Sequence, residues 1–148
     1  MILQTRIGKL IKDLKAISEV DIWLLSAGDQ SVLEFVHQLQ IDQLQRGQRP
    51  DGTEYPIYSE VSQAVYGKPN APFKWEDSGY FYKHIKPIVG PDFIQINDNG
   101  TIGDDGERIN LEVRFNEEII GLQNDSLKEL TEKIKEKYLF NLREVILR

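Results

Sequence analysis

The sequence predicts an α+β fold in which a small antiparallel β-sheet packs against two or three long amphipathic helices. Apolar residues recur at three- and four-residue steps towards both ends of the chain and alternate with polar residues in its middle, and turn residues separate these segments. At 148 residues the chain suits one domain with a single core. The expected segments are N-terminal helices over 5–46, an ordered Tyr- and Pro-rich loop over 47–74, a β-hairpin region over 80–115 and a C-terminal helix over 127–146.

The composition limits the classes of protein to which the chain can belong. It contains no cysteine, which excludes disulfides, thiolate nucleophiles and Cys-based zinc sites and suits a reducing cytoplasm. A net charge of −6 argues against a protein that coats nucleic acid, because neutralising phosphates requires a basic stripe. No apolar run approaches the ~20 residues that cross a bilayer, and residues 1–15 lack the apolar stretch of a signal peptide. We therefore expect a soluble protein without a processed leader.

The first part of the chain predicts two helices joined by a short bridge. Residues 5–19 repeat aliphatic side chains at helical spacing, with lysines on the other faces. Residues 21–25 form an apolar bridge that ends at a breaker. Asp29 is a suitable N-cap for a second helix over 30–45, which Gly47 should stop.

The loop over 47–74 is expected to be ordered. Its Arg-Pro-Asp-Gly sequence at 49–52 predicts a turn, and 62–66 can form a helical turn before Gly67. Disordered linkers are poor in aromatic residues, so the three tyrosines here must be buried against their own domain or against a neighbouring subunit. They are Tyr55, Tyr58 and Tyr66.

The stretch over 74–82 is the densest in aromatic residues, with four of them around a polar turn. Asp77, Ser78 and Gly79 form the structural motif of this turn. Side chains of Asp and Ser accept hydrogen bonds from nearby backbone N–H groups, and Gly tolerates a positive φ. The aromatic side chains should hold the turn against the core.

The residues after this turn predict a β-hairpin. Its arms are 80–89 and 93–97, separated by Gly-Pro-Asp, and Pro87 restricts the first arm to a sheet edge. Residues 109–115 alternate between apolar and polar side chains, which predicts a half-buried strand, although a short helix would also bury its larger apolar residues.

The end of the chain predicts a long helix. Residues 119–122 form a buried segment before it, and Ser126 with Glu129 forms a capping box, so the helix should begin at Leu127. Its buried stripe would consist of Leu130, Ile134, Tyr138, Leu142 and Val145.

The sequence predicts no catalytic residue, no metal site and no cofactor. His37 and His84 lie far apart and in no metal-ligand spacing. The acidic residues over 98–107 do not alternate as a calcium loop requires. Glu76 and Asp77 are adjacent, so their side chains usually point apart, and turn chemistry explains them more simply than acid–base catalysis.

Four short motifs follow one another along the chain. They are Arg-Pro-Asp-Gly-Thr-Glu-Tyr over 49–55, Tyr-Ser at 58–59, Glu-Asp-Ser-Gly-Tyr-Phe over 76–81 and Ile-Ile-Gly-Leu-Gln over 119–123, the last before the Ser126 helix. In this order they resemble the phage virion morphogenesis, or tail-completion, family, over roughly residues 38–146.

The chain departs from the pattern of that family at three places. Ser78 stands where Thr is usual, which keeps a hydroxyl cap. Trp75-Glu76 replaces Leu-Arg, which keeps an apolar residue and reverses a charge. Arg114-Phe115-Asn116 is all that stands for the family's Tyr-Gly or His-Gln-Gly approach to the closing segment.

The resemblance implies a structural virion protein of a tailed bacteriophage and not an enzyme. Such a protein would be a neck or tail-completion subunit that joins head and tail, assembled as a homo-oligomeric ring in the host cytoplasm. Its partners would be copies of itself and other neck or tail proteins, while DNA passes through without sequence-specific binding and no membrane is involved. Tyr55, Tyr58 and Tyr66 would then lie at the subunit interface.

A second hypothesis comes from a different class of protein. The chain could be a small cytoplasmic hydrolase or binding domain with a cleft around Glu76, Asp77 and Tyr80. The sequence leaves open the tail type of the phage, the position and stoichiometry of a ring, and whether the isolated protein is monomeric.

Overall fold

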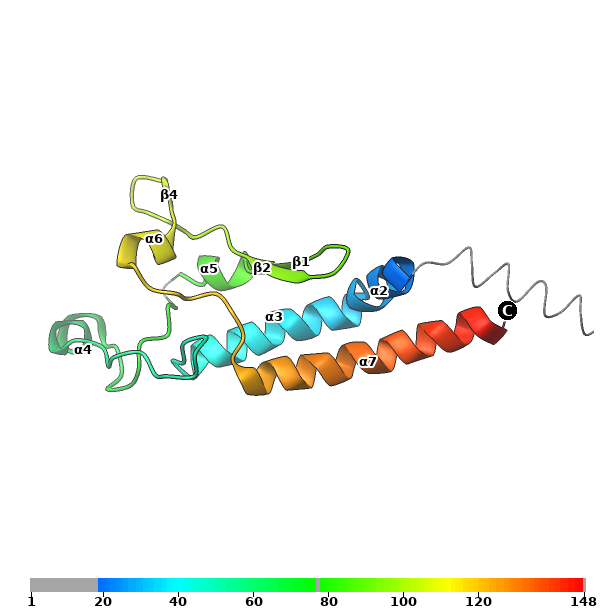
Figure 1. The fold of residues 1–148 in the computed structure, drawn as a ribbon. Coiled ribbons are helices and arrows are strands. Elements are labelled where there is room, and N and C mark those ends of the chain that lie inside the picture. Colours follow the sequence, from blue (N-terminus) through cyan, green and yellow to red (C-terminus); the bar gives the residue numbers. More distant parts are fainter. Residues whose placement is uncertain (1–18, 77, 148) are drawn as a thin grey trace, which may run out of the picture.

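The computed structural model describes residues 19–76 and 78–147 and has the α+β fold that the sequence predicts (Figure 1). Helices within this part of the chain accompany two separate antiparallel sheets of two strands each. The helix predicted over 5–19 lies outside the described residues, except for Glu19. The elements are α2 (Glu19–Ala27), α3 (Gln30–Gln45), α4 (Glu60–Tyr66), α5 (Tyr80–Lys83), β1 (Lys86–Val89), β2 (Ile94–Asn97), β3 (Thr101–Ile102), β4 (Arg108–Ile109), α6 (Leu111–Phe115) and α7 (Asn124–Leu147).

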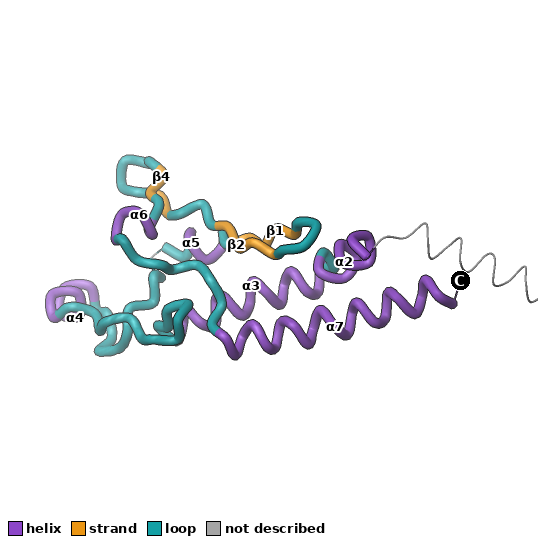
Figure 2. The backbone as a smooth tube through the Cα atoms, in the orientation of Figure 1, coloured by secondary structure: helices purple, strands orange, loops and turns teal. Residues whose placement is uncertain are grey.

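The long helices α3 and α7 lie side by side and form the axis of the molecule (Figures 1 and 2). α2 packs on the C-terminal half of α7, where Asn141 Nδ2 donates to the buried Ser26 Oγ at 3.0 Å. The β1–β2 hairpin lies along α3, and α4 stands at the opposite end of the axis from α2 (Figure 2). None of the described helices combines the length and the apolar character that crossing a bilayer requires.

The bounds of α3 confirm the prediction from local signals. Asp29 Oδ1 accepts a hydrogen bond from Ser31 N at 2.9 Å, as an N-cap does. Gly47 follows the last turn with a φ of +69°, and a Cβ there would lie 2.4 Å from Pro72 Cβ. Glycine therefore ends α3 and also permits the close approach of the chain at Pro72.

Two packed clusters share α3. One joins α3 to the first half of α7 through Val32, Val36, Leu39 and Leu130. The other joins α3 to the central loops, α5 and α6. Its buried residues are Ile41, Leu44, Tyr55, Trp75, Phe81, Tyr82, Ile85, Leu111 and Ile119.

The structure corrects two predictions about helices, one at the first described helix, α2, and one at the start of α7. Residues 21–25, predicted as a bridge, belong to α2, because Ile22 and Ser26 are buried on a narrow face that α7 covers.

The capping box predicted at Ser126 is also wrong. α7 begins at Asn124, and Leu127 N donates to Gln123 O at 3.0 Å, so Ser126 is a buried residue of the first turn. The predicted stripe of α7 is confirmed in part, since Leu130 and Val145 are buried, whereas Ile134, Tyr138 and Leu142 are half-buried.

The hairpin is confirmed, with corrected arms. β1 pairs with β2 in the register Lys86↔Asn97 to Val89↔Ile94, and Pro87 lies in a strand that is a sheet edge, as predicted. The first arm is shorter than predicted, because the residues from Tyr80 to Lys83 form α5. Gly79, at a φ of +79°, turns the chain into that helix.

The strand predicted over 109–115 is wrong, and the short helix that would also bury its larger apolar residues is correct. β4 ends at Ile109, and Asn110 Oδ1 then accepts from Val113 N at 2.9 Å to cap α6. Only Leu111 of α6 is buried. An N-capping side chain therefore outweighs the alternating pattern in this segment.

Candidate functional site

The first candidate site is the turn at 49–52, which forms as predicted. Gly52 N donates to Arg49 O at 2.9 Å, and Gly52 has a φ of +87°. The Asp51 carboxylate accepts from Thr53 N at 2.8 Å and from Thr53 Oγ1 at 2.6 Å. These bonds lower the pKa of Asp51 and fix the turn.

Arg49 joins this turn to the segment before α7. Its guanidinium donates to both carboxylate oxygens of Glu117, at 3.1 and 3.2 Å, across 68 positions of sequence. The hydrogen bond raises the pKa of Arg49 and lowers the pKa of Glu117. The guanidinium also lies 4.8 Å from the centre of the Tyr55 ring, a cation–π distance.

Tyr55 extends the same connection into the core. It is only 3% exposed, and its hydroxyl donates to Glu118 O at 3.0 Å. Burial raises the pKa of the Tyr55 hydroxyl to about 12, so this group stays a neutral donor at physiological pH.

Two buried glutamines of α3 hold the segment over 119–123. Gln43 Nε2 donates to Gly121 O at 2.8 Å, and Gln43 Oε1 accepts from Gln123 N at 2.9 Å. Gln40 Oε1 accepts from Gly121 N at 2.9 Å. We call Gln40 and Gln43 the glutamine clamp. The sequence analysis did not find it, because glutamines in an amphipathic helix are usually on the surface.

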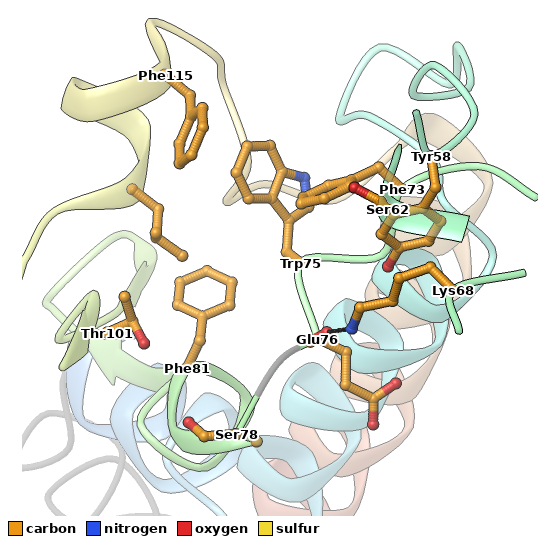
Figure 3. A pocket seen from close by; sticks show the side chains of 12 residues that line it. Tyr58, Ser62, Lys68, Phe73, Trp75, Glu76, Ser78, Phe81, Thr101 and Phe115 are labelled. Atoms are coloured by element: carbon orange, nitrogen blue, oxygen red, sulfur yellow. Dashed lines mark hydrogen bonds between the residues drawn. The ribbon is translucent and has the colours of Figure 1, made fainter. Parts of the chain in front are cut away.

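The second candidate site is an aromatic pocket of about 250 Å³ between α4, α5 and α6 (Figure 3). Its walls include Tyr58, Phe73, Trp75, Phe81 and Phe115. Trp75 lies at a φ of +57° and makes edge-to-face contacts with Phe73 and Phe115, at centroid distances of 4.8 and 5.2 Å. A positive φ is a strained conformation for a tryptophan, and the surrounding rings hold it there.

The rim of the pocket carries its polar groups. Lys68 Nζ donates to Glu76 O at 3.3 Å across the opening, and Ser78 lies below it (Figure 3). Ser78 Oγ accepts from Tyr80 N at 3.3 Å, a turn contact of the kind predicted. Asp77 lies outside the described residues. The pocket therefore offers apolar contact with few polar groups.

The two histidines have structural partners. His37 Nε2 lies 3.1 Å from Tyr82 O, and His84 Nδ1 lies 2.7 Å from Tyr80 O. The His84 ring also stacks on the Tyr80 ring at 3.8 Å. Within residues 19–76 and 78–147, no group of three His, Asp or Glu side chains is placed to hold a metal ion.

The three predicted interface tyrosines have different surroundings. Tyr55 and Tyr58 are buried in the core of their own chain, and Tyr58 packs on Phe73 at a centroid distance of 4.9 Å. Tyr66 is 73% exposed at the end of α4. Of the three, only Tyr66 is placed to contact a neighbouring subunit.

Comparisons of the chain with protein-family models, with curated protein sequences and with solved structures found no match. The argument for function therefore rests on the residues of this chain.

Proposed function

We propose that the chain is a structural virion protein of a tailed bacteriophage, a neck or tail-completion subunit that joins head and tail and acts as a ring. The observation that carries this proposal is the contact between two of the motifs that resemble the tail-completion family. The motif over 49–55 and the motif over 119–123 are far apart in sequence but approach each other at Pro50 and Gly121. The first motif also bonds the two residues just before that stretch, Glu117 and Glu118.

Contacts of these motifs and of the residues beside them hold the two segments together. A Cβ at Gly121 would lie 3.2 Å from Pro50 Cβ, so the two backbones approach closely. Gln123 Nε2 donates to Gln48 Oε1 at 3.1 Å, beside the pair of Arg49 and Glu117. These contacts join two distant segments of the fold, which is compatible with a structural role.

The surface of the molecule is compatible with a place in a ring. α4 has no buried residue, and several of its apolar side chains are exposed, as contacts with neighbouring subunits require. The net charge of −6 would repel DNA from the wall of a channel, so that DNA can slide through it.

One observation favours the alternative of a hydrolase or binding domain. Glu76 and Ser78 lie on the rim of the aromatic pocket, where they could meet a small ligand. In this case Glu76 would act on the ligand or orient it.

Both hypotheses can be tested in the phage whose genome would encode the chain. Deleting the gene should give heads and tails that do not join, visible in electron micrographs, and a large loss of infectivity. The parent protein supplied in trans should restore infectious particles, as should Glu76→Gln, because assembly does not require that carboxylate. Purified virions should contain the chain by mass spectrometry.

Two results would contradict the proposal. Intact, tailed and infectious particles without the protein would exclude a role in joining head and tail. A Glu76→Gln protein that folds but fails to complement would favour the hydrolase or binding domain.

A further inference from the structure

The aromatic pocket has a size that suits one small ligand. Its volume of about 250 Å³ exceeds the ~150 Å³ of a cavity that takes up benzene, so a single aromatic ring with a short polar group can fill it. The rings of its walls come from three separate stretches of the chain, which are the loop over 58–75, α5 and α6. The pocket is therefore formed by the fold as a whole and not by an irregularity of one loop.

Trp75 forms a wall of this pocket in a strained conformation. It is one of two residues other than glycine with a positive φ in the described part of the chain. Glycine would adopt this conformation without strain, but it would leave no ring in contact with Phe73 and Phe115. Strained backbone conformations cluster at functional sites, so the position of Trp75 favours a binding role for the pocket.

Part of the aromatic wall is open to solvent. Phe115 is 51% exposed and Phe73 is half-buried, although both contact the buried Trp75. A ring placed in the pocket would cover these exposed faces. Aromatic pairs in edge-to-face or offset arrangements gain free energy beyond the area that they bury, which favours an aromatic ligand over an aliphatic one.

The opening of the pocket carries an ammonium group. Lys68 Nζ donates to Glu76 O at 3.3 Å and lies 5.6 Å from the centre of the Tyr58 ring. No carboxylate of the described residues pairs with Lys68, and the Glu76 carboxylate extends away from the rings (Figure 3). Because an ammonium group has three hydrogens to donate, Lys68 can bond a ligand as well as Glu76 O.

We propose that the aromatic pocket binds a small aromatic carboxylate, with the ring of the ligand among the aromatic side chains and its carboxylate on Lys68 Nζ. A charge-assisted hydrogen bond of this kind is stronger than the present bond to a carbonyl oxygen. A cationic ligand would instead meet the like charge of Lys68. This site goes beyond the virion role and does not depend on it.

Three probes of similar shape but different charge test the proposal. They are phenylacetate, its neutral analogue phenylacetamide and the cation benzyltrimethylammonium. Binding can be followed by the fluorescence of Trp75 in a Trp23→Phe background, because the chain contains two tryptophans and Trp23 lies on α2, outside the pocket. Phenylacetate should bind about tenfold more tightly than phenylacetamide and should bind more weakly as the salt concentration rises. Benzyltrimethylammonium should bind most weakly of the three.

Variants then separate the contribution of the charge from that of the rings. Lys68→Gln should reduce the affinity for phenylacetate to about that for phenylacetamide and leave phenylacetamide binding unchanged, because only the charge is lost. Lys135→Gln is the matched control, an exposed lysine on α7 outside the pocket, and should bind both probes as the parent does. Phe115→Ala should weaken the binding of both probes about fivefold, because a wall is removed, with the fold of the variant checked by circular dichroism.

Three results would overturn the proposal. If neither phenylacetate nor phenylacetamide binds at millimolar concentrations, the pocket takes no such ligand. Equal affinities for the two, unchanged in Lys68→Gln, would show that Lys68 does not select a carboxylate. Tighter binding of benzyltrimethylammonium would show that the rings select a cation. None of these results bears on the virion role, which deletion of the gene tests separately.

Discussion

Two neighbouring parts of one loop segment differ in their relation to the core. Residues 47–58 contact a segment far along the chain, since Arg49 pairs with Glu117 and the Tyr55 hydroxyl donates to Glu118 O. Residues 60–66 form α4, in which no residue is buried. Both parts contain tyrosine. Burial of an aromatic side chain therefore depends on whether a distant segment arrives to cover it.

The largest expected effect comes from replacing the tyrosines of the two parts. Tyr55→Ala should lower the free energy of unfolding by about 3–5 kcal/mol, because a buried ring and its hydrogen bond are lost. Tyr66→Ala should change it by less than about 0.5 kcal/mol, as expected for an exposed side chain. Urea denaturation of both variants measures the difference, and equal effects would remove the distinction between the two parts. Replacing all three tyrosines together should unfold the chain.

The glutamine clamp gives the next largest effect. Gln43→Leu should cost about 1–3 kcal/mol in total, because it leaves two half-buried backbone groups, Gly121 O and Gln123 N, without their partner. Gln38→Leu is the matched control on α3, where the exposed Gln38 Nε2 donates to Asp42 Oδ1 at 2.7 Å within the same helix. If the two variants have the same urea midpoint, the clamp does not stabilise the fold.

Local signals in the sequence were sufficient for several elements. Asp29 predicts the start of α3 and Gly47 its end, because both act on backbone groups within a few residues. The turn at 49–52 and the hairpin around Gly90 also follow from short stretches. The aromatic pocket was predicted only in part, as a cluster of aromatic residues around a turn.

The remaining features depend on contacts across the chain. α2 is a helix because α7 covers Ile22 and Ser26, which no local pattern indicates. The glutamine clamp has partners 78 to 81 positions away, and the burial of Tyr55 depends on the segment before α7. Short-range patterns identified apolar residues that should be buried, but they did not identify the distant segments that bury them.

Gly79, before α5, and Gly67, after α4, have similar backbone strain, so substitutions at them compare the stability of the core with that of α4. Gly79 and Gly67 both have a positive φ, +79° and +62°, and a Cβ at either would meet no atom within 4 Å. Gly79→Val should cost about 1–3 kcal/mol, from φ strain alone. Gly67→Ala should cost less in global stability, because α4 can unfold without exposing any buried residue. Equal shifts in melting temperature would show that α4 unfolds together with the core.

The smallest expected effect is the dependence on pH of the pair between Arg49 and Glu117. The folded pKa of Glu117 is lowered from 4.5, so the stabilisation is complete above that value and disappears as the pH falls through the lowered pKa. Glu117→Gln should reduce the loss of stability in acid, measured as melting temperature between neutral pH and pH 3. Asp125→Asn is the control, since Asp125 and Lys128 form a pair whose side chains are 87% and 79% exposed. A Glu117→Gln protein with the acid response of the parent would contradict this prediction.

The glutamine clamp also has a consequence for the synthesis of the chain on the ribosome. Gln43 and Gly121 lie 78 positions apart. At the usual ~5–20 residues per second, α3 is made roughly 4–16 s before the segment that its glutamines bind. During this interval the amides of Gln40 and Gln43 remain hydrated, and one side of α3 has no cover. The nascent chain can therefore close its core only after the residues just before α7 have left the exit tunnel.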